Sequence, residues 1–280
     1  MTMTISKRFD EDGYVTLEGA IGEDALRSIR EAAARIVEDF DVEAHRSVFS
    51  TADRDRGRDR YFMDSAEAVH CFLEEQSLDK NGRLKCPKSR AINKIGHALH
   101  DLVPEFTAFC RLPAFSEVLA ALGYERPQLW QTMYIYKQPR IGGEVRWHQD
   151  ASYLHSLTSP VVGLWVALED ATLENGCLWV QPGGHRSPLR DSYEVDPVTR
   201  MGVLRAIDST PWPGEGEGLP IEINAGGVIV FSDRMPHYSS ANRSERSRQA
   251  FTMHFSEHDA QWSPLNWLQR HRLPPFYLDS

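Results

Sequence analysis

His148 and Asp150 are separated by a single residue and could bind the same metal ion. Side chains alternate between the two faces of a strand, so residues at this spacing project from the same face. A second histidine, His237, follows the strongly apolar, strand-like segment 227–232. Two imidazoles and one carboxylate make a facial triad that leaves coordination positions open, which is typical of non-haem Fe(II) oxygenases. These three residues therefore predict an iron site, with all three as ligands.

The spacing of His148 and Asp150 is weak evidence by itself. The chain has 11 histidines and 40 acidic residues in 280, so such a pair arises readily by chance, for example in an exposed turn. Arg248 makes the pattern more specific, because it opens a second apolar segment, 249–255. A permanently charged guanidinium inside a barrel is costly unless it meets an anion, and its planar shape fits a carboxylate with two hydrogen bonds.

Strand-like segments separated by turn residues dominate the chain from Gln128 onward. They cover 128–138, 145–149, 161–168, 177–181, 219–223, 227–232, 237–241 and 248–256. Their number and spacing predict an eight-stranded antiparallel double sheet of the jelly-roll, cupin-like kind. We therefore expect a mainly β fold with flanking α-helices, in which a double-stranded β-helix positions the candidate ligands.

The first part of the chain has mostly helical patterns. A short strand is expected at 13–17, and helices are expected at 23–37, 65–75, 91–102 and 114–122. We expect one domain over 1–280, with a helix-rich part at about 1–125, the β-helix core at about 126–258 and a tail at 259–280.

Two segments are expected to lie outside these elements. Segment 53–61 alternates in charge, which favours a solvated loop, or alternatively a mobile lid over an anionic substrate. The long insert 184–218 is rich in Gly, Pro and charge, and is expected to border the mouth of the site.

Composition points to small-molecule partners. The net charge of −9 and the pI near 5.7 argue against binding to nucleic acid or to an anionic membrane. No run of about 18 apolar residues is present, and the N-terminus has no apolar signal segment. The four cysteines are widely spaced, without a C-x-x-C pair, as in a protein with reduced thiols. We expect a cytoplasmic protein without membrane or nucleic-acid partners; the sequence leaves its oligomeric state open.

Several further segments resemble the phytanoyl-CoA dioxygenase family, over about residues 9–275. They are 92–100, 133–135, 143–145, 148–152, 169–179, 246–250 and 262–268. The resemblance implies an Fe(II)- and 2-oxoglutarate-dependent oxygenase, with His148, Asp150 and His237 as the iron ligands. It also implies that Arg248 clamps the distal carboxylate of 2-oxoglutarate. Four more residues match positions that line this cosubstrate in the family: Lys94, Met133, Trp165 and Ser239.

The expected reaction couples oxidative decarboxylation of 2-oxoglutarate to oxidation of a small molecule by O2, with succinate and CO2 as products and hydroxylation as the expected outcome. In related halogenases a small residue replaces the carboxylate ligand and frees a position for halide. The presence of Asp150 therefore favours hydroxylation, desaturation or another oxidation over halogenation. The bulky Trp147 is expected to shape the substrate pocket. Nothing in the sequence indicates a coenzyme A site.

Two other function classes fit parts of the pattern. A divalent-metal cupin-type isomerase or hydrolase would use the ion as a Lewis acid, but has no use for Arg248 or O2. A non-catalytic sensor would bind 2-oxoglutarate without consuming it.

The other histidines are interpreted in simpler terms. His97 and His100 are expected in packing or surface roles, and His254 and His258 are not expected to form a second metal site. His155 and His185 lie in loops near the predicted mouth and are candidates for substrate contacts.

Overall fold

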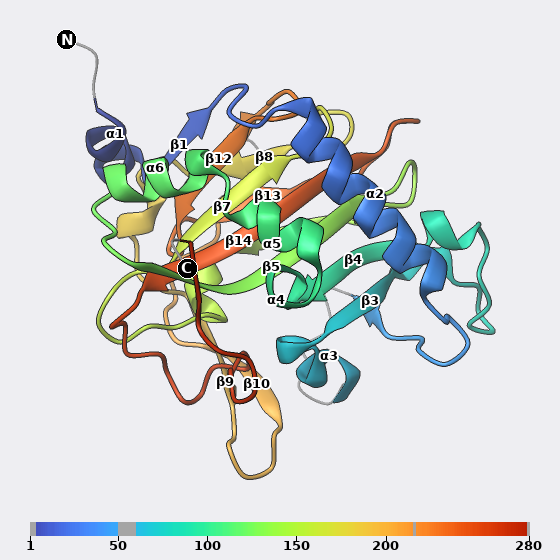
Figure 1. The fold of residues 1–280 in the computed structure, drawn as a ribbon. Coiled ribbons are helices and arrows are strands. Elements are labelled where there is room, and N and C mark those ends of the chain that lie inside the picture. The colour runs from blue at the N-terminus through green and yellow to red at the C-terminus, as the bar shows by residue number, and fades with distance from the viewer. Residues whose placement is uncertain (1–3, 50–59, 215–216, 279–280) are drawn as a thin grey trace.

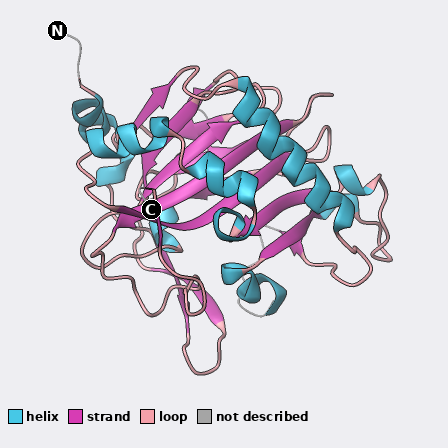
Figure 2. Cartoon of the chain, in the orientation of Figure 1, coloured by secondary structure: helices cyan, strands magenta, loops and turns pink. Residues whose placement is uncertain are grey.

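Two sheets, antiparallel except for the parallel pair β2–β3, form the centre of the computed structural model, which describes residues 4–49, 60–214 and 217–278 (Figures 1 and 2). The larger sheet has the order β1-β12-β7-β14-β5-β4-β3-β2, and β15 also pairs with β5. The smaller sheet has the order β11-β8-β13-β6, and β9 and β10 form a separate hairpin. This architecture confirms the expected mainly β, cupin-like fold.

The strands of the larger sheet are β1 (Tyr14–Leu17), β2 (Val48–Phe49), β3 (Val69–Glu74), β4 (Ile92–His97), β5 (Pro127–Lys137), β7 (Val162–Ala167), β12 (Val228–Ser232), β14 (Arg248–Glu257) and β15 (Phe276–Tyr277). Those of the smaller sheet are β6 (Val145–His148), β8 (Leu178–Val180), β11 (Leu219–Ile221) and β13 (His237–Ser239). The hairpin consists of β9 (Asp191–Val195) and β10 (Gly202–Ala206).

The helices are α1 (Ile5–Asp12), α2 (Glu23–Asp39), α3 (Arg60–Asp64), α4 (Leu99–Leu102), α5 (Pro104–Cys110) and α6 (Pro113–Ala121). Short 3-10 turns occur at η2 (Ser65–Glu67), η3 (Glu75–Ser77), η4 (Lys88–Arg90), η5 (Asp150–Ser152) and η6 (Gly184–Arg186). Within the described residues, no helix is long and apolar enough to cross a bilayer.

The two faces of the larger sheet pack against different partners. On β7, Leu164 and Val166 belong to a hydrophobic cluster that also contains residues of α2, α5 and α6. Trp165 and Ala167 on the same strand belong to a second cluster, which is shared with strands of the smaller sheet. Figure 1 accordingly shows α2, α4 and α5 covering one face of the large sheet. Inward-facing side chains therefore project into the space between the sheets.

The strand predictions of the β core are confirmed, since each of the eight expected segments contains or overlaps a strand. Two helix predictions in the first part are wrong over most of their length. Segment 91–102 forms β4 followed by the short α4, and segment 65–75 forms η2 followed by β3. Both strands are buried on both faces over most of their length, so they lack the alternation of apolar and polar residues that identifies a strand.

Three smaller differences concern connecting segments. Residues 5–12 form helix α1, which the sequence did not lead us to expect before the strand at 13–17. The insert 184–218 is only partly loop, because it contains η6 and the β9–β10 hairpin, which projects from the body of the molecule (Figure 1). Most of segment 53–61 lies outside the described residues, which resume at Arg60.

Candidate functional site

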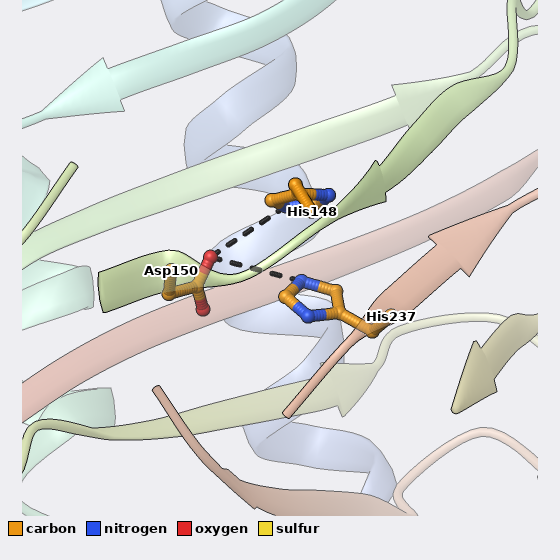
Figure 3. A group of neighbouring side chains, drawn as sticks. All are labelled: His148, Asp150 and His237. Carbon is orange, nitrogen blue, oxygen red and sulfur yellow. Dashed lines mark ion pairs between the residues drawn. The ribbon is translucent and has the colours of Figure 1, made fainter. Parts of the chain in front are cut away.

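The three predicted metal ligands converge between the sheets (Figure 3). His148 ends β6, His237 begins the neighbouring β13, and the two residues are directly paired. Asp150 lies in η5, immediately after β6. Its Oδ1 is 3.6 Å from Nε2 of His148 and 3.7 Å from Nε2 of His237. One ligand atom from each residue lies within 4.8 Å of those of the others, a spacing that suits a shared metal ion.

Both histidines have their other ring nitrogen fixed by the backbone. Nδ1 of His148 is 2.8 Å from the carbonyl oxygen of Arg146, and Nδ1 of His237 is 2.9 Å from that of Met235. A carbonyl only accepts, so each Nδ1 donates its proton and each Nε2 of the neutral ring carries a lone pair. This tautomer is the one needed for ligation through Nε2, and carbonyl partners of this kind orient ligating histidines in metal sites.

Asp150 is ionised in this setting. Burial raises the pKa of its carboxyl, but His237, His254 and His148 outweigh that effect and hold the pKa below its ordinary value. Oδ2 accepts a hydrogen bond of 2.9 Å from Nε2 of His254. Two imidazoles that offer Nε2, together with one carboxylate, match the donor set of the facial triad.

Arg248 is buried in the same cavity, with 2% of its surface exposed. Its Nη2 is 3.5 Å from Oγ of Ser239, and its guanidinium carbon lies 5.3 Å from the centre of the Trp165 ring. Its Nε and Nη1 have no hydrogen-bond partner among the described residues. Burial lowers the pKa of Arg248 to about 10, so it remains a cation at neutral pH. A buried cation with unsatisfied donors fits an anionic group such as a carboxylate.

The four remaining predicted cosubstrate residues line this cavity as well. They are Lys94 on β4, Met133 on β5, Trp165 on β7 and Ser239 on β13. Nζ of Lys94 is 3.9 Å from Sδ of Met133. Lys94 was expected on a helix and instead lies on a strand, opposite Ile135 of β5. The pairing of β4 with β5 thus brings it to the inner face of the larger sheet.

The cavity has a volume of about 600 Å³, and several of its lining side chains besides Trp165 are aromatic. This lining includes Phe62, Trp147, Tyr153, Tyr193, Trp212 and Trp267. The rings of Phe62 and Trp267 are 4.5 Å apart, and those of Trp147 and Tyr238 are stacked at 5.5 Å. Trp147 therefore forms part of the pocket wall, as expected.

The other histidines divide into packing and lining roles. His100 is fully buried and hydrogen-bonds to Thr132, in agreement with a packing role. His97 hydrogen-bonds to Ser65 and also lines the cavity. His155 and His185, the candidate substrate contacts, are not among the lining residues that the structure describes.

His254 is a contact of the site that sequence reasoning missed. It lies on β14, six residues after Arg248, and alternation along a strand places both side chains on one face. That even spacing was the available signal. What the sequence did not reveal is that this face meets Asp150, which belongs to a segment more than 100 residues earlier.

Comparison with known proteins identifies relatives along nearly the whole chain. The family model described as "Phytanoyl-CoA dioxygenase (PhyH)" matches residues 9–250. A "Phytanoyl-CoA dioxygenase" of Arabidopsis thaliana is 38% identical over 272 residues, which cover 96% of this chain and 94% of the relative. The mouse "Phytanoyl-CoA dioxygenase domain-containing protein 1" is 38% identical over 288 residues, which cover 97% of each chain.

Solved structures share the fold at lower identity. The non-heme alpha ketoglutarate dependent carbocyclase SnoK matches with a TM-score of 0.64 and 18% identity, covering 98% of this chain and 99% of its own. The epimerase SnoN, solved with Fe3+, alpha ketoglutarate and nogalamycin RO, matches with a TM-score of 0.66 and 15% identity, covering 96% and 89%. At these identities the similarity establishes a common fold.

Proposed function

This chain belongs to the phytanoyl-CoA dioxygenase family and is an Fe(II)- and 2-oxoglutarate-dependent oxygenase, and from that premise we propose that it hydroxylates a small, largely apolar molecule. The reaction consumes O2 and converts 2-oxoglutarate to succinate and CO2. The observation that carries the proposal is the presence, in one cavity, of a His-Asp-His cluster and of a buried guanidinium with unsatisfied donors.

The proposed metal ligands are His148, Asp150 and His237. Iron held by three protein groups keeps positions open for 2-oxoglutarate and O2, and this combination supplies the oxidising chemistry. The carbonyl oxygens of Arg146 and Met235 keep the two rings in the ligating tautomer. The protein thus presents a preformed donor set to the ion.

The second set of residues is proposed to hold 2-oxoglutarate. Arg248 would bind its distal carboxylate with two hydrogen bonds, and Ser239, adjacent to Nη2, would add a hydroxyl donor. Lys94, Met133 and Trp165 would complete the walls around the diacid. Because these side chains are buried or nearly so, they would also exclude water from the reacting groups.

The proposed substrate is uncharged and mostly apolar. The cavity wall contributed by α3, the β9–β10 hairpin, the segment after it and the C-terminal tail consists of Phe62, Asp191, Tyr193, Leu204, Trp212 and Trp267. Its single charged member, Asp191, is acidic and would repel an anionic substrate. Aromatic and aliphatic side chains with few polar groups are typical of sites for apolar ligands. This wall carries no basic side chain for the phosphates of coenzyme A among its described lining residues, although Arg146 lines the cavity from β6.

Further proposals concern organisation and location. We propose that residues 1–280 act as one domain, supported by a hydrophobic cluster that joins Leu26 and Ile29 of α2 to Val166 and Phe251 of the larger sheet. A cytoplasmic location is supported by the four cysteines, none of which forms a disulfide.

The test measures succinate release from 2-oxoglutarate in the presence of Fe(II) and O2, with pools of metabolites separated into neutral apolar, acidic and acyl-CoA fractions. We expect the neutral apolar pool to accelerate release most. Acceleration by the acyl-CoA pool alone would refute the substrate proposal and leave the oxygenase intact. Binding of 2-oxoglutarate with no succinate under any condition would instead indicate a sensor. Turnover of a pool that needs the metal but neither 2-oxoglutarate nor O2 would indicate an isomerase or hydrolase.

A further inference from the structure

The two carboxylate oxygens of Asp150 have different partners. Oδ1 faces Nε2 of His148 and Nε2 of His237, at 3.6 and 3.7 Å. Oδ2 accepts a hydrogen bond of 2.9 Å from Nε2 of His254. His254 is not a member of the group whose ligand atoms lie within 4.8 Å of one another. One oxygen is thus directed to the proposed metal position and the other to a residue outside it.

The direction of each hydrogen bond follows from the chemistry of the groups. An ionised carboxylate can only accept, so the proton between Oδ2 and His254 belongs to Nε2 of the histidine. In the neutral ring Nδ1 is then an acceptor. Nε2 of Gln131 lies 3.2 Å from it and supplies the donor. Gln131, His254 and Asp150 therefore form one consistently oriented chain.

This series of hydrogen bonds connects the two sheets. Gln131 is on β5 and His254 is on β14, which are paired in the larger sheet with these two residues opposite each other. Asp150 belongs to a three-residue turn that follows β6 of the smaller sheet. Gln131 and His254 are 5% and 2% exposed, so water competes little for their hydrogen bonds. The extended sheet thereby restrains a short turn that carries a proposed metal ligand.

We infer that His254 is a positioning residue that keeps Asp150 in a monodentate orientation, with Gln131 holding His254 in turn. A carboxylate without such a partner can turn and coordinate a metal through both oxygens, as carboxylates often do. That second bond would occupy a position that the facial triad must leave open. The inference rests on the proposed metal ligands and concerns how one of them is oriented.

The test titrates Co(II) into the metal-free protein and records the visible absorption of the bound ion, its stoichiometry and its dissociation constant. His254→Leu removes the donor to Oδ2. We expect it to weaken Co(II) binding about 10- to 100-fold, the range found when partners of metal ligands are removed. We also expect a changed absorption spectrum, because a carboxylate that binds through both oxygens alters the coordination number.

Three further variants separate positioning from other roles. His254→Gln can offer an amide N–H to Oδ2 and should restore most of the affinity and the parental spectrum. Gln131→Leu leaves the bond to Asp150 in place and should weaken binding by less, about 2- to 10-fold. His258→Leu is the matched control, because the exposed ring of His258 hydrogen-bonds to Glu257 and does not line the cavity. This variant should leave binding unchanged.

The possible outcomes decide between distinct explanations. Parental affinity and spectrum in His254→Leu would overturn the inference. Equal losses in His254→Leu and His254→Gln, with a similarly altered spectrum, would also overturn it by making His254 a ligand. If His254→Leu does not fold, His254→Gln and Gln131→Leu provide the test. Failure of the parent protein to bind Co(II) would refute the metal assignment itself. Normal Co(II) binding by the parent, with unchanged affinity and spectrum in the variants, would refute the positioning role only.

Discussion

The two ends of the cavity satisfy their buried polar atoms in different ways. At the metal end, formed by His148, Asp150 and His237, each histidine donates to a backbone carbonyl and the carboxylate accepts from His254. At the guanidinium end, Nε and Nη1 of Arg248 have no hydrogen-bond partner among the described residues. The protein alone therefore preorganises the first end, while the second requires an anion to complete its hydrogen bonds.

Lys137 shows that the difference does not follow from burial alone. It lies opposite Arg248 in the pairing of β5 with β14 and is equally buried. Its ammonium group donates to the carbonyl oxygens of Gly143, Ser239 and Ser240, at 2.6, 3.2 and 2.5 Å. Two buried basic side chains are thus neighbours; the protein supplies acceptors for Lys137, whereas Nε and Nη1 of Arg248 have no partner among the described residues. Unsatisfied donors of this kind mark a binding function.

The largest effect is expected at the metal end, from Asp150→Gly. This change removes a proposed ligand and leaves the N–H of His254 without its acceptor. Since removal of a partner of a metal ligand already costs about 10- to 100-fold, loss of the ligand itself should lower 2-oxoglutarate turnover by more than about 100-fold. Succinate release measured without added substrate is the readout. Retained turnover would exclude Asp150 from the ligand set.

The second prediction concerns Arg248→Met, for which stability and binding should change in opposite directions. The metal-free, 2-oxoglutarate-free variant should be more stable than the parent by about 1–4 kcal/mol, because an apolar side chain replaces a buried charge with unsatisfied donors. Its KM for 2-oxoglutarate should rise about 30-fold or more, since loss of a buried charge partner costs about 2–5 kcal/mol. Thermal unfolding and succinate kinetics measure the two effects.

Arg248→Lys is the control for this prediction. It keeps the positive charge but not the planar pair of donors, so its KM should lie between those of the parent and Arg248→Met. A methionine variant that is less stable than the parent would contradict the comparison, because it would mean that the protein itself satisfies Arg248.

The proposed metal ligands could be identified from the sequence because their residue types and their spacing are local features. The close spacing of His148 and Asp150 keeps them together at the end of β6, the apolar segment 227–232 precedes His237, and the apolar segment 249–255 follows Arg248. The β core was predictable because turn residues separate its strand-like segments. Local spacing does not predict contacts between residues of different sheets. The hydrogen bond between His254 and Asp150 was therefore not predicted.

The errors in the first part of the fold have a different physical origin. β3 and β4 extend the larger sheet beyond β5 and are covered on both faces, so the burial of their side chains does not alternate. The apolar residues of β4 at positions 92 and 95 also fit a helical period. Pairing of β4 with β3 and β5 makes this segment a strand. Lys94 was consequently assigned to the right cavity through family resemblance but to the wrong kind of element.

The smallest predicted effect concerns Asp233, a buried acid near the metal end, and tests whether that end is fully satisfied. Burial raises the pKa of Asp233 to about 7, and the charge of Asp150 adds to this effect, although Val161 N–H donates to the carboxylate. The folded protein therefore binds a proton that the unfolded chain releases near its ordinary pKa of 3.8. Stability from this group is complete below the unfolded pKa and is lost as the pH rises through about 7.

Asp233→Asn replaces the protonated acid with a neutral amide of similar shape and should remove this dependence. Between pH 5 and 7, the free energy of unfolding of the metal-free parent should fall relative to the variant by at most about 1.4 kcal/mol per pH unit, the value for one proton. Added Co(II) should reduce the difference, because a cation beside Asp150 offsets the charge that raises the pKa of Asp233. Parallel stability curves for parent and variant would show instead that Asp233 is ionised throughout, and that the metal end contains an unsatisfied charge of its own.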